Sequence, residues 1–183
     1  MRHSLSVLVV LSLVGMASTS PVHAWPPDAL REVLNEGYRP SSIQVQNPRT
    51  QGDVIKPGVV LVLQADGVSA NKLRFAQINT KSPRFHVRDY ARVEIAPDGR
   101  LTVGSGEVTL AKLTRLVVLD LKVDSDRVRL FTHTLTPVRV GDGQLAYGCT
   151  EFFFRFDAGA LERADAALIE GRIGELLVLA STK

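Results

Sequence analysis

Residues 116–135 constrain the fold of this chain more than any other segment. Apolar side chains alternate with Asp, Lys and Arg in both of its halves, 116–123 and 127–135. A period of two is typical of strands that bury one face and expose the other, and Asp124-Ser125-Asp126 supplies turn residues between the halves. The segment therefore predicts a β-hairpin in which 117, 119, 121 and 123 share one face while Val128 and Leu130 point inward.

Other segments carry strand signals of the same kind. The compact apolar run at 59–63 indicates a strand that is buried on both faces and therefore central in a sheet. Pro97-Asp98-Gly99 separates two short β-branched segments and is a strong turn signal. Alternation near the C-terminal end puts Phe152, Phe154 and Phe156 on one face and Phe153 and Arg155 on the other. In all, these patterns add predicted strands at 59–63, 73–78, 92–96, 101–103 and 145–156.

Helix signals lie at the two ends. After Pro26-Pro27, apolar residues at i, i+3 and i+4 followed by Gly37 predict a short helix over about 27–36. Asp165 can cap a second, amphipathic helix over about 164–179, although Gly171 and Gly174 weaken it by up to about 1 kcal/mol each relative to Ala. The helix is expected to present one apolar stripe, which comprises Leu168, Ile169, Ile173, Leu176 and Leu177. The polar stretch 38–53 is predicted to be a loop or an irregular edge.

Together these elements predict a mainly β domain of the α+β type. About seven strands lie between residues 58 and 156, and tight turns join them, which favours a small antiparallel barrel or sandwich. The short N-terminal helix and the C-terminal helix could cover an open face or a sheet edge. With no linker inside it, the segment 25–183 is expected to form a single mature domain.

The first 24 residues have the layout of a secretory signal peptide. Arg2 and His3 precede an apolar run over 5–16, and Val22-His23-Ala24 places small residues around a cleavage point. This predicts a periplasmic or secreted protein that begins at Trp25, with an uncleaved N-terminal anchor as the alternative. No cysteine follows the cleavage point, so a lipoprotein is not expected, and no later stretch has the length of a transmembrane segment.

The formal net charge of +3 argues against a protein that binds nucleic acid through a basic surface. Positive charge is nevertheless concentrated in residues 72–92, which hold six basic residues and one acidic residue. Strand alternation would place Arg84, His86, Arg88 and Tyr90 on one face, where they could bind an anionic lipid head group, a cell-wall polymer or an acidic protein. The alternative is a solvated strand or loop whose charges are balanced by acids from elsewhere.

Cys149 is the only cysteine, so an intramolecular disulfide is excluded. His133 together with Gly148-Cys149 loosely resembles the L,D-transpeptidases, in which a histidine precedes a Gly-Cys pair. The detail differs, because Thr134 stands where those enzymes have glycine, and Thr150 and Glu151 replace an apolar residue and an arginine. No catalytic residue is therefore assigned, and Cys149 is expected to be buried.

Metal and cofactor motifs are not recognised in the sequence. Asp124-Ser125-Asp126 and Asp142 are interpreted as turn residues, because the twelve-residue calcium loop is missing. His86 and His133 lie too far apart in sequence to suggest a zinc site. Phosphate-binding glycine motifs and serine elbows are also missing, so no cofactor is expected.

Three patterns resemble a group of small uncharacterised exported bacterial proteins. They are the strand and turn over 58–68, the hairpin over 116–130, and Phe152-Phe153-Phe154-Arg155-Phe156 with the helix that follows. The resemblance spans roughly 52–178. It implies an exported, β-rich, signal-peptide-bearing domain and implies no activity.

These observations favour an exported soluble binding or interaction module of the cell envelope. Its partner would be an envelope protein, a lipid or a cell-wall polymer, and its ligand could be anionic. Two alternatives stay open: an envelope-acting enzyme, either a hydrolase or a transferase, and a structural subunit of an envelope complex that docks through its terminal helices.

Overall fold

The computed structural model describes residues 27–47, 51–56, 58–77, 85–140, 143–163 and 166–181. The predicted signal peptide and Asp165 lie outside this part of the chain. Its elements are, in order, α1 (Pro27–Gly37), β1 (Ser42–Asn47), β2 (Gln51–Lys56), β3 (Val60–Leu63), β4 (Val68–Lys72), β5 (Arg74–Gln77), β6 (Phe85–Arg88), β7 (Ala91–Ile95), β8 (Leu101–Val103), β9 (Val108–Leu110), β10 (Arg115–Val123), β11 (Arg127–Thr134), β12 (Val138–Arg139), β13 (Leu145–Ala146), β14 (Gly148–Arg155), α2 (Ala160–Arg163), α3 (Ala166–Gly174) and β15 (Leu177–Leu179).

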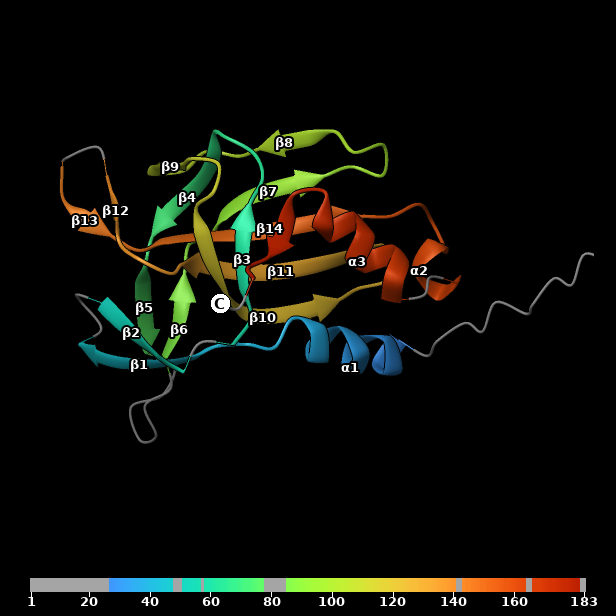
Figure 1. The fold of residues 1–183 in the computed structure, drawn as a ribbon, viewed down its shortest axis with the longest axis horizontal. Coiled ribbons are helices and arrows are strands. Elements are labelled where there is room, and N and C mark those ends of the chain that lie inside the picture. Colours follow the sequence, from blue (N-terminus) through green and yellow to red (C-terminus); the bar gives the residue numbers. More distant parts are fainter. Residues whose placement is uncertain are drawn as a thin grey trace, which may run out of the picture.

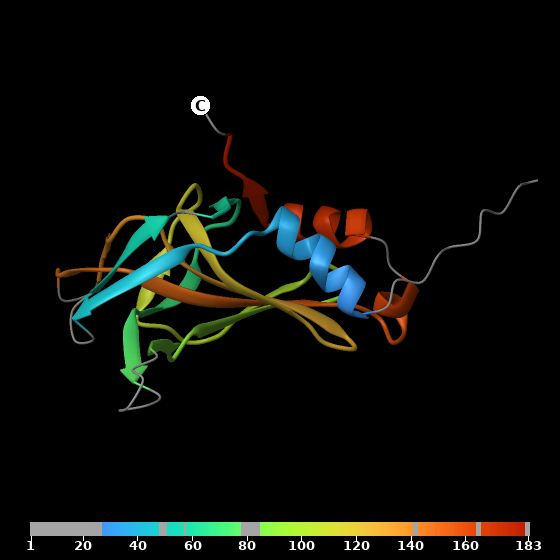
Figure 2. The same ribbon diagram turned by 90° about the horizontal axis from the view of Figure 1, so that it is seen from below.

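The protein is mainly β, as predicted, and its largest element is a curled nine-stranded sheet (Figure 1). Its strands follow the order β15-β3-β10-β11-β14-β4-β9, with β7 beside β14 and β8 beside β7. The prediction of a barrel or sandwich of about seven strands is wrong, because the sheet forms an open half-barrel. Helix α1 packs against β10 and helix α3 against β15 (Figure 2). Both helices lie on the concave side of the sheet, the side on which a closed barrel would have more strands.

Strand β14 mixes two directions of pairing. It pairs antiparallel with β11 along one edge. On its other edge, Gly148 and Cys149 pair antiparallel with β4, and Thr150–Phe154 pair parallel with β7. The sheet is therefore not purely antiparallel.

The hairpin of β10 and β11 confirms the strongest sequence prediction, with one correction. A β-bulge interrupts the register between Val118 and Asp120. Before the bulge, Leu116 and Val118 face the core, and after it Leu121 does. The predicted common face of 117, 119, 121 and 123 is wrong because the extra residue of a bulge reverses the alternation.

The hydrophobic core lies between the concave face of the sheet and the two long helices. Phe152 and Phe154 of β14 are fully buried there, as the alternation predicted. Leu34 of α1 and Ile173 of α3 belong to the same cluster. Helix α1 confirms the predicted N-terminal helix, and its burial gives a short helix the tertiary support that it needs.

The structure corrects two predictions of local structure. Residues 38–53 are more regular than the predicted loop or irregular edge, because β1 and β2 form an antiparallel hairpin. Ile43 and Val45 alternate with glutamines, which is a weak period of two in a polar segment. The single helix predicted over 164–179 is wrong, because only α3 is helical among the residues described there and β15 follows it as a strand. Residues 177–179 extend as a strand because they pair with β3, whose apolar edge would otherwise lie open.

Candidate binding cleft

The structure does not bring the four residues of the predicted basic site together on one described strand face. Arg84 lies outside the described residues, and β6 contains His86 and Arg88, of which only the backbone is described. Tyr90 does not continue their alternation, because β6 ends before Asp89, whose φ of 57° turns the chain. The Tyr90 ring instead packs edge-on against the ring of Phe131 in β11, with 5.2 Å between the two ring centres. Burial raises the pKa of its hydroxyl.

Two cations of the basic segment are neutralised by acids from elsewhere. Arg74 donates two hydrogen bonds to the carboxylate of Glu107, at 2.7 and 2.9 Å. Arg92 contacts Glu94 at 2.9 Å. The cations lower the pKa of both carboxylates, with Arg74 acting on Glu107 and Arg155 and Arg92 on Glu94. The anion-binding face around Arg84, His86 and Arg88 stays a prediction, and these two neighbours add little free positive charge to it.

Cys149 is buried, as predicted, and lies directly opposite His133 on the neighbouring strand. Burial raises the pKa of the thiol and lowers that of the imidazole. At neutral pH the pair therefore consists of a thiol and a neutral imidazole. A thiol nucleophile must instead be available as a thiolate in contact with substrate, so this pair lacks the properties of a catalytic site.

The convex face of the sheet carries an arrangement that the sequence analysis did not identify. The Phe153 ring lies between two guanidinium groups, with Arg92 at 4.0 Å and Arg129 at 5.4 Å from its centre. Arg129 also binds Glu151 at 2.7 Å. The alternation of arginine with apolar residues in β11 and β14 was the available signal, but it did not show which cations meet which ring.

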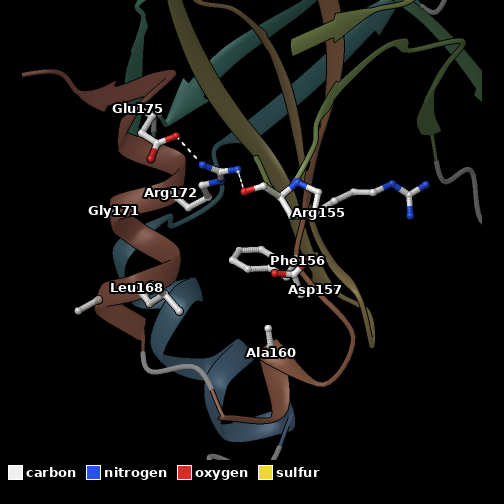
Figure 3. A pocket seen from close by; sticks show the side chains of 10 residues that line it. Arg155, Phe156, Asp157, Ala160, Leu168, Gly171, Arg172 and Glu175 are labelled. Atoms are coloured by element: carbon white, nitrogen blue, oxygen red, sulfur yellow. Dashed lines mark hydrogen bonds and ion pairs between the residues drawn. The ribbon is translucent and has the colours of Figure 1, made fainter. Parts of the chain in front are cut away.

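A cleft of about 530 Å³ opens between α3, the end of β14 and the turn after β7 (Figure 3). Its apolar lining includes Phe156 and Leu168, and the Leu168 side chain is 57% exposed at the rim. Leu168 is therefore not on the buried stripe where the sequence analysis placed it. The complete lining is Pro97, Arg155, Phe156, Asp157, Ala160, Ala167, Leu168, Gly171, Arg172 and Glu175.

Arg172 fixes one wall of this cleft. Its guanidinium donates hydrogen bonds to the carbonyl oxygens of Ala96 at 2.5 Å and Pro97 at 2.6 Å, and to Glu175 at 2.8 Å. These bonds connect α3 to the Pro97-Asp98-Gly99 turn, where Gly99 adopts a φ of 87° that favours glycine. The wall is therefore held by charge-assisted bonds to the turn after β7, and the i,i+3 pair with Glu175 orients the guanidinium.

The charged groups of the cleft are unequally satisfied. Arg155 binds Glu94 and Asp126, and Arg172 binds Glu175. Among the described residues, no ion pair involves the exposed carboxylate of Asp157. Both cations are thus compensated while an anion remains, so the electrostatics of the rim favour a positive group on a ligand.

No local sequence pattern predicts the cleft, because its lining comes from three separate segments. The only local signal was the pair Gly171 and Gly174, unusual inside a helix, of which Gly171 lines the cleft.

Within the described ranges, no three His, Cys, Asp or Glu side chains gather where they could hold a metal ion. In the same part of the chain, no helix is long and apolar enough to cross a membrane. No family model, curated protein or solved structure matches this chain.

Proposed function

We propose that this protein is an exported binding module that holds a small amphipathic ligand in the cleft beside α3. The observation that carries the proposal is the cleft itself, which combines an apolar floor with a few charged groups at its rim. Its volume of about 530 Å³ falls in the range of small-molecule sites, about 300–1,000 Å³. Export rests on the predicted signal peptide.

The ligand class follows from the charges around the cleft. An apolar body would cover Phe156 and Leu168, and a cationic end would lie near Asp157. An anionic end would have to compete with the carboxylates that already bind Arg155 and Arg172. The proposed ligand is therefore an amphiphile with a positive head group. The neutral state of His133 and Cys149 gives the rival enzyme reading no support.

A cleft-filling substitution tests this proposal. In Gly171→Leu the new side chain would meet no other atom at its Cβ and would project into the cleft. The change also removes a helical glycine, so the fold is expected to gain up to about 1 kcal/mol. Gly174→Ala is the matched control, because it lies in the same helix, meets nothing at Cβ and does not line the cleft.

The measurement is calorimetric titration with decyltrimethylammonium and with decanoate, both below their micellar concentrations. The wild type and Gly174→Ala should bind the cation more tightly than the anion, and Gly171→Leu should lose binding. Asp157→Asn should weaken the affinity for the cation by about 2–5-fold, as expected for the loss of an exposed ion pair. Equal binding by Gly171→Leu and the wild type would exclude the cleft as the site.

A further inference from the structure

His133 and Cys149 face each other on the side of the sheet away from the helices. They are register partners in the antiparallel pair of β11 and β14. Their neighbours in register, Leu130 and Phe152, belong to the helix-covered core and lie an odd number of residues away, so the pair points to the opposite face. The Cβ atoms of directly opposed residues lie about 4.5–5.5 Å apart. The strand register therefore places one imidazole and one thiol side by side.

The imidazole of His133 is set up as an acceptor. Its Nδ1 lies 2.6 Å from the carbonyl oxygen of Thr134, and because a carbonyl only accepts, Nδ1 carries the proton. Nε2 therefore has a bare lone pair, and it is buried without a hydrogen-bond partner. A buried acceptor left unpaired destabilises the fold. A histidine with Nδ1–H on a carbonyl and Nε2 available has the arrangement of a metal ligand.

The thiol of Cys149 supplies the second ligand. Its side chain is fully buried, and the chain has no other cysteine with which it could form a disulfide. A buried thiolate without a positive partner is costly. A metal cation that replaces the thiol proton removes this difficulty, because the negative sulfur is then neutralised where it forms.

The charge and the number of ligands decide which metal fits. The exchange is Cys–SH + M⁺ → Cys–S–M + H⁺, which leaves the buried site neutral when M is monovalent. A divalent ion would leave a net positive charge in an apolar environment and prefer four ligands. The described residues provide no group of three His, Cys, Asp or Glu side chains that could supply them. Sulfur and imidazole are the ligands that soft copper(I) prefers.

We propose that Nε2 of His133 and Sγ of Cys149 form a buried two-coordinate site for a soft monovalent cation, copper(I) or silver(I). The site is separate from the cleft beside α3, and neither residue lines that cleft. It gives a role to the unpaired nitrogen and to the only thiol of the chain, which the proposed ligand-binding function does not use.

Silver(I) titration of the whole protein in chloride-free buffer tests the site. Native mass spectrometry should show one silver ion per chain, with one proton released, and Tm should rise because the metal binds the folded state. Zinc(II) at the same concentration should not raise Tm. Silver is added both to folded protein and during refolding, so that slow entry into a buried site does not resemble a failure to bind.

Two variants separate this site from ordinary thiol chemistry. Cys149→Ala should abolish silver binding, and His133→Gln should weaken it at least 10-fold while leaving the thiol in place. In the wild type, ¹⁵N NMR should show a shift of the His133 Nε2 resonance on silver addition, a readout that does not depend on how well either variant folds. An unchanged Nε2 resonance, or full-strength binding to a folded His133→Gln, would overturn the proposal.

Discussion

The two faces of β14 show how differently one strand can be stabilised. On the concave face, Phe154 is fully buried among leucines and isoleucines from the sheet and helices. On the convex face, the adjacent Phe153 is almost as well covered, with 6% of its surface exposed, but its cover is Arg92 and Arg129. Similar burial is thus reached once by apolar packing and once by stacked cations.

This difference has an energetic meaning. Removing a phenylalanine from water is worth about 1.5–3 kcal/mol on either face, and a cation stacked on the ring adds about 0.5–1 kcal/mol at exposed sites. The concave face also holds both helices in place, so packing defects there affect several elements. The convex face involves charged side chains that solvent can replace, so its contribution is expected to depend on salt and pH.

The largest expected effect is that of Phe154→Ala. The substitution leaves a cavity in the core between the sheet and the helices, and such changes cost about 3–5 kcal/mol. Urea denaturation should show this loss equally at low and high salt. A loss below about 1 kcal/mol would show that the concave face is not the principal core.

A smaller effect is expected for Phe153→Leu. The variant keeps an apolar side chain but removes the aromatic ring on which Arg92 and Arg129 stack. The loss should be about 1 kcal/mol, the sum of two weak cation–π contacts. Phe154→Leu is the matched control, because no cation stacks on the Phe154 ring. The interpretation fails if the two substitutions lower the free energy of unfolding by the same amount at every salt concentration.

The smallest effect is expected for Glu94→Gln, which removes a partner of Arg155 and Arg92. Arg155 holds the pKa of Glu94 below its ordinary value of 4.5. The carboxylate therefore stabilises the fold above pH 4.5, and this contribution disappears as the pH falls through the lowered pKa. Urea midpoints of wild type and variant should differ slightly at neutral pH and converge in acid and in 1 M salt. A difference that grows in acid would contradict the ion-pair interpretation.

Much of the fold was predictable where local patterns and tertiary packing agree. The alternation of β11 and β14 and the Pro97-Asp98-Gly99 turn correctly indicated paired strands. Helix α1 was predictable because Leu30 and Leu34 share a helix face and that face is buried.

Other features depend on contacts that no local pattern reveals. The bulge near Leu119 leaves no mark in a sequence that alternates well on both sides of it. Residues 177–179 suit a helix as well as a strand, and only the open edge of β3 selects the strand. The cleft has the same origin, because Pro97, Phe156 and Leu168 meet only after the chain folds. The sequence alternation placed Tyr90 on the same face as the candidate anion-binding residues. In the structure β6 ends at Arg88, and the Tyr90 ring packs against Phe131.

The pairing of β3 with β15 has a consequence for how the chain folds. Residues 61–63 pair with residues 177–179, which lie more than a hundred positions later in the chain. The apolar edge of β3 therefore stays unpaired until almost the whole chain is available. Such distant pairings slow folding because the chain must close a long loop before any contact forms. β15 is also short, with Val178 and Leu179 exposed, so we expect the C-terminal end to open first in the native protein. Removing these last residues would leave the edge of β3 unpaired, and such an edge favours aggregation.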